Sequence, residues 1–343
     1  RLAFFPLLPL LIHLAMASTH LPFEVVGTVI NNGGFLAALL VVYRWVDQSH
    51  GPRLAQWCTA VVAWCPFSLF GTVIYTEGLF LAFSTAALYT FQHRHYGAAA
   101  LWGALATATR VTGLALVPTF LLVAWRQQRS WAAYLSALGS TVGIALYSAY
   151  CGWRFHEPLG FIKVQHLFWQ QEQDFWGQSW IKMFAQVTIG SQNWKQGHLV
   201  DPWHPLIVVL IAVLGYSIWH HRQRLQPNTV CYLSYILILG FWILAGNPLV
   251  NTVVILGGAG LVALGRHRLG LLAWVYGLSS FAIIFSSGRT TSAERYTYGI
   301  ISVSLALGFL LARHPRWGQL TLGFFGVLLL LFSIRFSQHL WVA

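Results

Sequence analysis

Long apolar runs alternate with short polar and basic loops along almost the whole chain. Most of these runs approach the roughly 20 residues that a helix needs to cross a hydrocarbon core. We therefore expect an all-α, polytopic transmembrane protein with about 11–12 membrane segments. The apolar runs cover residues 23–43, 54–71, 79–91, 97–125, 131–150, 205–219, 228–245, 248–264, 269–286, 299–312 and 318–334.

Small arginine clusters lie between the apolar runs: Arg44 and Arg53, Arg94, Arg126 and Arg129, Arg222 and Arg224, Arg266 and Arg268, Arg313 and Arg316. The positive-inside rule places such loops in the cytoplasm. The loops around Glu77, Gly246 and Ser287 then face the other side, together with the long loop over residues 151–204. Seven of the eight acidic residues fall on or near that side. Any acid chemistry is therefore expected to be extracytoplasmic.

One apolar run, residues 97–125, is too long for a single crossing. As one helix it would be about 43 Å long, against a hydrocarbon core of about 30 Å. A single crossing would also place Arg126 and Arg129 outside and invert every later loop. We therefore predict two short helices that meet near residues 109–113 (TRVTG), where threonines and a glycine can satisfy an opened backbone.

The chain is expected to form one membrane domain over residues 1–343, with residues 151–204 inserted as an extracytoplasmic loop. Residues 2–17 are a poor spanning helix, because Pro6 and Pro9 interrupt them. We expect an interfacial or re-entrant piece there. The start at Arg1, without a methionine, predicts a further helix upstream.

Composition limits the function classes. Of 343 residues only 8% are charged, while 57% are apolar, which excludes an ordinary soluble enzyme and a disordered chain. The net charge of +12 could suggest nucleic acid, but the basic residues flank apolar runs. We therefore expect membrane lipid as a partner and no nucleic acid. The expected location is the bacterial cytoplasmic membrane, or the endoplasmic reticulum membrane in a eukaryote.

Two ionisable residues at membrane depth stand out, because burying such a group there costs about 2.5–3.5 kcal/mol on insertion scales. Arg110 either donates to the free carbonyls of the broken helix or binds an anion. Glu77 follows Tyr75 and Thr76 where the chain re-enters the membrane from outside. It is either a charge favoured by a helix N-terminus or an acid that orients a hydroxylated substrate.

A second charged group, Glu294-Arg295-Tyr296, precedes the apolar run that starts at residue 299, with Arg289 nearby. Arginines beside a helix N-terminus attract phosphate, although a surface ion pair with an interfacial tyrosine would look the same. The pair Glu172 and Asp174 could hold a divalent cation. The several further oxygen ligands that such an ion needs are not visible, so no metal site and no cofactor are predicted.

Five stretches together resemble one family: residues 3–10 (AFFPLLPL), 66–80 (PFSLFGTVIYTEGLF), 108–113 (ATRVTG), 157–161 (EPLGF) with Gln165 and Trp169, and 294–296 (ERY). In this order they resemble the PIG-V-like mannosyltransferases, which are related to GPI mannosyltransferase II and belong to the GT-C membrane glycosyltransferases. The resemblance spans nearly the whole chain. It implies a GT-C-type fold.

The resemblance also implies an activity. A sugar, mannose in that family, would pass from a polyprenyl-phosphate carrier to the hydroxyl of a glycan or glycolipid acceptor on the extracytoplasmic face. Relatives carry the presumed catalytic Asp just upstream of the AFFPL-like stretch, so the main base is expected upstream of Arg1. Glu77 is then a supporting acid. The expected substrate-binding residues are Tyr75, Arg110, Gln165, Trp169, Arg295 and Tyr296. The competing hypothesis is a non-catalytic carrier or flippase for a prenyl-linked or other amphiphilic anion.

Overall fold

The computed structural model describes residues 5–169, 178–288, 290, 292–340 and 342, without the side chains of residues 165–169. The described residues form helices and turns and no strand, which confirms the all-α prediction. The helices are α1 Leu7–Thr19, α2 Phe23–His50, α3 Pro52–Trp64, η1 Pro66–Ser68, α4 Leu69–Thr72, α5 Glu77–Gln92, α6 Tyr96–Thr109, η2 Val111–Ala115, α7 Leu116–Arg126, α8 Trp131–Gly139, α9 Val142–Phe155, α10 Gly160–Trp169, α11 Gln178–Ile189, α12 Ser191–Gln196, α13 Trp203–His220, α14 Pro227–Ala245, α15 Asn247–Thr252, η3 Val253–Gly257, α16 Gly258–Leu264, α17 Arg266–Ser286, α18 Ala293–Tyr298, α19 Ile301–Arg313 and α20 Pro315–Ser337.

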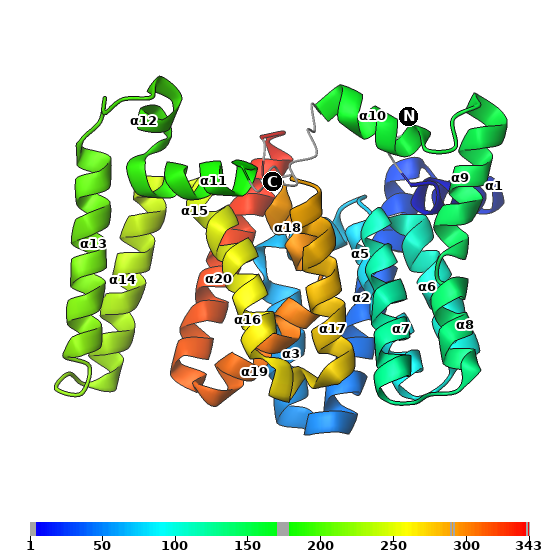
Figure 1. Ribbon diagram of the computed structural model, residues 1–343, viewed down its shortest axis with the longest axis horizontal. Helices are drawn as coiled ribbons and strands as arrows, with labels where there is room; N and C mark the ends of the chain where they lie inside the picture. Colours follow the sequence, from blue (N-terminus) through cyan, green and yellow to red (C-terminus); the bar gives the residue numbers. More distant parts are fainter. Residues whose placement is uncertain (1–4, 170–177, 289, 291, 341, 343) are drawn as a thin grey trace.

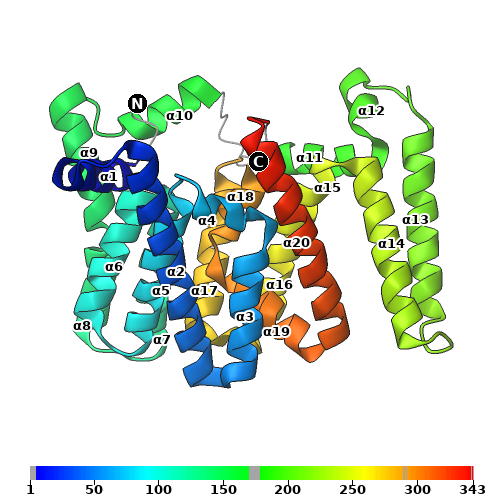
Figure 2. The same ribbon diagram turned by 180° about the vertical axis from the view of Figure 1, so that it is seen from behind.

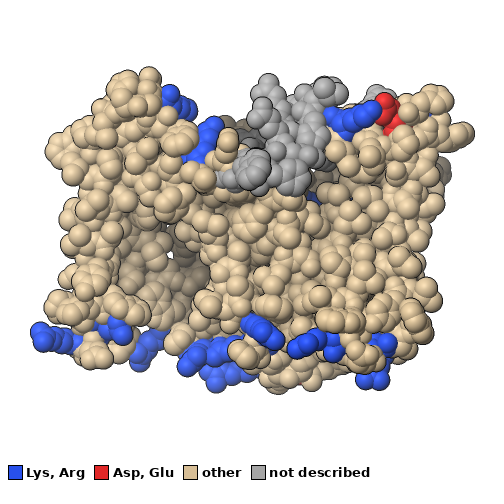
Figure 3. Space-filling model, viewed as in Figure 1, with Lys and Arg blue, Asp and Glu red and all other residues tan. Residues whose placement is uncertain are grey.

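The long helices run side by side between two edges of the molecule (Figures 1 and 2). The turns that join α2 to α3, α5 to α6, α7 to α8, α13 to α14, α16 to α17 and α19 to α20 all lie at the lower edge in Figure 1. These turns carry the arginine clusters, and Figure 3 shows a row of basic residues along that edge. We call it the basic edge and the other one the opposite edge.

Not every predicted segment forms a helix that is long enough to cross a membrane alone. Seven helical segments of the described residues qualify by length and hydropathy, or eight if the bent pair of α3 with residues 66–72 counts as one. The prediction of a polytopic helical membrane protein is confirmed, and its count of about 11–12 membrane segments, which includes the short broken pair around Arg110, stays a prediction. The other predicted runs form shorter helices, chiefly α5, α6, α7 and α19. One end residue of each is buried inside the protein: Glu77, Thr109, Leu116 and Ile301. Such ends are tolerated at membrane depth where protein surrounds them.

The predicted break in residues 97–125 is confirmed. Helix α6 ends at Thr109, Arg110 is extended (φ −155°, ψ 145°), and the 3₁₀ turn η2 leads into α7, which returns toward the basic edge (Figure 1). At the opposite edge α1 lies across the ends of the spans in both ribbon views, as expected of an interfacial piece. Helices α10, α11 and α12, from the long loop, lie at the same edge.

The described residues form one main hydrophobic core and a helical hairpin that lies outside it. The main hydrophobic core lies between α2, α3, α5, α7, α17 and α19. The hairpin of α13 and α14 stands apart from it (Figure 1), and only 6% and 11% of its two apolar windows are buried within the protein. Lipid would cover such faces. The core, by contrast, surrounds the helix ends that carry the candidate site.

Candidate active site

Glu77 is the first residue of α5, and the chain just before it is bent out of regular helix. Helix α3 ends at Trp64, and Pro66 begins the next helical piece at an angle of 65° to it. Proline cannot continue the hydrogen bonding of the preceding helix, so a break is expected here. The chain then turns through residues 73–76 and re-enters the core at Glu77, whose side chain is 1% exposed.

Two arginines from distant parts of the chain meet this carboxylate. Arg110 Nη1 donates to Glu77 Oε1 and also to Thr76 Oγ1, at 3.2 Å. Arg295 Nε lies 3.0 Å from the same Glu77 oxygen. The two arginine side chains are 11% and 16% exposed. Arg110 thus uses its guanidinium for side chains and not for the carbonyls of the broken helix, which was the structural alternative.

Aromatic rings surround both guanidinium groups. The centre of the Tyr296 ring lies 4.9 Å from the Arg110 guanidinium carbon and 5.6 Å from that of Arg295. Phe80 adds a contact to Arg110, and Phe70 and Tyr75 add contacts to Arg295 at 5.2 and 5.3 Å. Ring faces stabilise cations by about 0.5–2 kcal/mol each, most strongly where water is scarce. The rings therefore hold the arginines without neutralising them.

The group has unused binding capacity. One carboxylate faces two guanidinium groups, so the formal charge of the trio is positive. Among the described residues, Glu77 Oε2 has no hydrogen-bond partner, and Arg295 Nε, although close to Glu77, lacks hydrogen-bond geometry. Buried polar atoms are normally paired, and an exception at such a cluster is typical of a functional site. The arrangement can therefore accept an anionic group beside the arginines.

Glu294 precedes Arg295 on α18 and is also buried, with 8% of its surface exposed. No residue that the structure describes forms a hydrogen bond with its Oε2. Burial raises the pKa of its carboxyl above the ordinary value, against the opposing effect of Arg295. The alternative of a surface ion pair at residues 294–296 does not hold for Arg295, because its carboxylate partner is the buried Glu77.

Two asparagines that the sequence analysis did not single out fix the bent segment. Asn31, fully buried on α2, donates from Nδ2 to the carbonyls of Gly71 (2.9 Å) and Val73. Its neighbour Asn32 donates to the carbonyl of Thr72 at 2.8 Å. These bonds satisfy carbonyls that the bend frees. Two consecutive amides in an otherwise apolar run were the sequence signal, since polar residues at membrane depth are costly.

A close approach of α2 to α5 sets the depth of Glu77. A Cβ on Gly78 would lie 2.7 Å from the carbonyl and side-chain oxygens of Asn31 and 2.8 Å from the carbonyl of Gly71. No side chain larger than hydrogen fits there without moving backbone. On the other side of the cluster Tyr298 donates to the carbonyl of Val62 at 2.9 Å, which ties α18 to α3.

The structure brings five of the predicted site residues together: Glu77, Arg110, Arg295, Tyr296 and Tyr75. Gln165 and Trp169 lie on α10, but their side chains are outside the described residues. Glu172, Asp174 and Arg289 also lie outside the described residues. Within the described part of the chain, no group of three or more His, Cys, Asp or Glu side chains could hold a metal ion.

Comparison with known proteins adds a family. The family model of glycosyltransferase family 87 matches residues 4–248, well over half of the chain. That range includes Tyr75, Glu77 and Arg110 and ends before Arg295. Among solved structures, the Archaeoglobus fulgidus oligosaccharyltransferase, crystallised as a complex with Zn and sulfate, is similar at 16% sequence identity with a TM-score of 0.45. No curated protein matches the chain.

The similarity to the oligosaccharyltransferase covers 97% of this chain and 43% of the other, so the chain spans less than half the length of that protein. The prediction of a glycosyltransferase agrees with the matched family. The narrower resemblance to PIG-V-like mannosyltransferases stays a prediction.

Proposed function

Because the chain belongs to glycosyltransferase family 87, we propose that it is a GT-C-type membrane enzyme that transfers mannose from a polyprenyl-phosphate carrier. The acceptor is a hydroxyl of a glycan or glycolipid on the extracytoplasmic face. The donor is a lipid-linked sugar phosphate, so the site must bind a phosphate at membrane depth. No metal or other cofactor takes part in the proposed reaction.

One observation carries the proposal: a single buried carboxylate, Glu77, holds Arg110 and Arg295 together where short helices end inside the protein. Arginine binds phosphate through charge-assisted hydrogen bonds, and each such bond is about twice as strong as a neutral one. Guanidinium groups positioned in advance stabilise charge as it develops on a leaving phosphate. The pair therefore suits a reaction in which phosphate leaves.

The proposed chemistry is a displacement at the anomeric carbon of the sugar. The acceptor oxygen forms a bond to that carbon while the bond from the carbon to the phosphate oxygen breaks. The electron pair goes to the lipid phosphate, which Arg110 and Arg295 bind, and the acceptor proton goes to a carboxylate base. Glu77 is a supporting acid in this scheme, because its Oε1 already pairs with both guanidinium groups.

The aromatic side chains have a second role in the proposal. Tyr75 is 37% exposed beside Arg295 and can contact the sugar or the acceptor. Tyr296 lies against both guanidinium groups and positions them. Gln165 and Trp169, on α10 at the same edge, are proposed to bind donor or acceptor.

The direct test is transfer in proteoliposomes with synthetic polyprenyl-phosphate mannose and a soluble glycoside acceptor. We expect the wild-type chain to release lipid phosphate and form a new glycoside, and Arg110→Ala to lose transfer while inserting normally. Arg224→Gln, on the loop between α13 and α14, is the matched control and should keep wild-type transfer. Movement of the intact lipid across the bilayer without product would instead support the carrier or flippase.

A separate labelling experiment tests which side of the membrane each edge of the protein faces. Single cysteines at Ser191 on α12 and at Gln223 between α13 and α14 should label from opposite sides, Ser191 from outside and Gln223 from the cytoplasm. The basic edge carries the Arg-rich turns, and the positive-inside rule supports this orientation. Labelling of Gln223 from outside would contradict the extracytoplasmic location of the reaction.

A further inference from the structure

A cavity of about 340 Å³ opens at the basic edge, at the other end of the helices that carry the candidate active site. Helix α5 links the two places: Glu77 begins it and Gln92, which lines the cavity, ends it. The two residues are about 22 Å apart at 1.5 Å per residue. The cavity is therefore separate from the Glu77 cluster.

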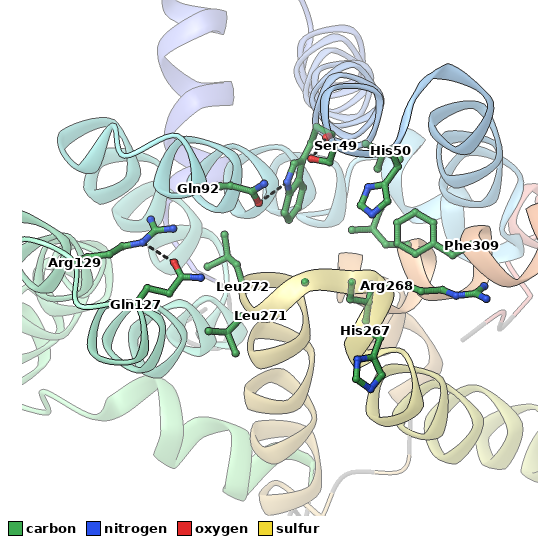
Figure 4. Close-up of a pocket in the computed structure, with 15 residues that line it drawn as sticks. Ser49, His50, Gln92, Gln127, Arg129, His267, Arg268, Leu271, Leu272 and Phe309 are labelled. Carbon is green, nitrogen blue, oxygen red and sulfur yellow. Dashed lines mark hydrogen bonds between the residues drawn. The ribbon is translucent and has the colours of Figure 1, made fainter.

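The wall of this cavity is basic and contains no acid. Its 15 lining residues, all of them described, include Arg129, Arg268, His50 and His267 and no Asp or Glu. Asp47 lies on the same end of α2 but does not line the cavity. In Figure 4 Gln92, Gln127 and Arg129 lie on one side of Leu272, and His50 and Phe309 lie on the other. The side chains of Arg268 and His267 extend outward at the rim.

Arg129 is held in place for binding. Its Nη1 donates to the carbonyl of Phe91 at 2.6 Å, and its guanidinium carbon lies 4.8 Å from the centre of the Phe91 ring. Its Nε donates to Gln127 Oε1 at 2.9 Å (Figure 4). No carboxylate neutralises it among the described residues. A fixed guanidinium loses less entropy when it binds an anion than a mobile one.

Two glutamine amides also present donors. Gln92 Oε1 accepts a bond of 2.8 Å from Trp45 Nε1, and Gln127 Oε1 accepts the bond from Arg129. Each carbonyl oxygen is thus used within the wall, and each amide keeps its NH₂ group for another partner. The cavity therefore offers hydrogen-bond donors and positive charge together.

The backbone adds positive potential at the same place. Helix α17 is broken at Gly270, which has φ 70° and ψ 163°, a conformation that favours glycine. The long part of α17 starts directly after it, with Leu271 and Leu272 in the cavity wall. The N-terminal end of a helix carries partial positive charge and favours anions such as phosphate.

From these features we propose that the cavity between α2, α5, α17, α19 and the turn from α7 to α8 binds a phosphate group at the basic edge. The phosphate belongs either to the headgroup of an anionic phospholipid or to a small soluble phosphate compound. Guanidinium, amide and helix-end donors are the groups that recognise phosphate oxygens. Leu272 and Phe309 add apolar surface to the cavity wall.

Binding to the full chain in phosphatidylcholine nanodiscs tests the proposal. One arm adds spin-labelled phosphatidylglycerol and measures the immobilised lipid fraction, and the other titrates inorganic phosphate by calorimetry. The double variant R129Q/R268Q should weaken binding roughly tenfold or more, since each charge-assisted bond removed is worth a large part of that factor. The control R222Q/R224Q removes the same charge from the loop between α13 and α14 and should bind as the wild type does.

The two arms of the experiment distinguish a lipid headgroup from a soluble phosphate compound. Selective loss in the lipid arm identifies a phospholipid headgroup, and selective loss in the phosphate arm alone identifies a soluble ligand. Absence of binding in both arms, or equal loss in the two double variants, overturns the proposal. Arg268 is exposed, so the single variant R268Q keeps the fold even if the loss of Arg129 disturbs the Phe91 contact. It should show a smaller loss than the double variant.

Discussion

The two edges of the molecule use arginine in different ways. At the opposite edge Arg110 and Arg295 are largely buried, share one carboxylate and lie against aromatic rings. At the basic edge Arg129 and Arg268 line an open cavity that contains no acid. Buried cations need a nearby counter-charge because desolvation is costly, whereas cations at a water-filled mouth do not. The buried arginines are therefore paired with a carboxylate inside the protein. The arginines of the cavity, which contains no acid, can instead bind an anion from water.

Removal of the carboxylate should give the largest effect. Glu77→Gln leaves two guanidinium groups together in the interior, and breaking a buried ion pair costs about 3–5 kcal/mol. We expect transfer in proteoliposomes to fall at least about 100-fold, which corresponds to roughly 2.7 kcal/mol, and the melting temperature to fall. Glu157→Gln is the matched control, because its pair with Lys163 is exposed and worth about 0–1 kcal/mol. Equal transfer rates and equal melting temperatures in the two variants would contradict the role of Glu77 in holding the buried arginines.

Gly78→Ala should have the next largest effect, because it tests the packing that positions Glu77 in the candidate active site. The added Cβ would lie 2.7 Å from Asn31, so α5 must shift and Glu77 must shift with it. Overpacking of this kind costs about 1–3 kcal/mol. Gly33→Ala on α2, where a Cβ meets nothing within 4 Å, is the control. Gly78→Ala should lower both the melting temperature and the transfer rate. Wild-type values of both would show that α5 tolerates the shift.

A carboxylate placed in the basic cavity would make the two edges alike. Ser49→Asp puts a negative charge in the wall of the cavity, and it should weaken phosphate or phosphatidylglycerol binding about tenfold by direct repulsion. Gln223→Glu adds the same charge to the loop between α13 and α14 and should leave binding unchanged. The nanodisc titration measures both. Unchanged binding in Ser49→Asp would contradict the assignment of the cavity.

The smallest expected effect concerns the rings of the buried site. Tyr296→Phe keeps the ring face against Arg110, whereas Tyr296→Leu removes it. A contact of this kind is worth about 0.5–2 kcal/mol. We expect a several-fold rise in the KM for the lipid-linked donor in Tyr296→Leu and near wild-type values in Tyr296→Phe. The reverse order would indicate that the phenol hydroxyl matters more than the ring.

The sequence alone was sufficient to predict most of the helices and part of the candidate active site. Arginine placement and helix length together predicted the break after Thr109, because only a broken helix keeps the basic turns on one side. The cost of burying charge selected Glu77 and Arg110, which are in contact. The structure also brings Arg295 to Glu77, although their functional roles stay predictions.

Other features depended on tertiary contacts that no local pattern encodes. Asn31 bonds to carbonyls about 40 positions later in the chain, and nothing in its own apolar run specifies that partner. Hydropathy also cannot tell a full crossing from a helix that ends inside the protein, so it does not identify which predicted segments are long enough to cross a membrane alone. The basic cavity draws its wall from four helices and from the turn between α7 and α8, so no motif could reveal it.

The short length of α5 has a consequence for the lipid around the protein. Its 16 residues extend about 24 Å, some 6 Å less than a typical hydrocarbon core. If its end at Gln92 lies level with one leaflet surface, Glu77 lies below the headgroups of the other leaflet. The phosphate of the proposed carrier lipid would then reach the arginines only where the bilayer thins or where the carrier sinks below its neighbours. Bilayer thickness would therefore control the reaction rate, and thinner membranes would favour it.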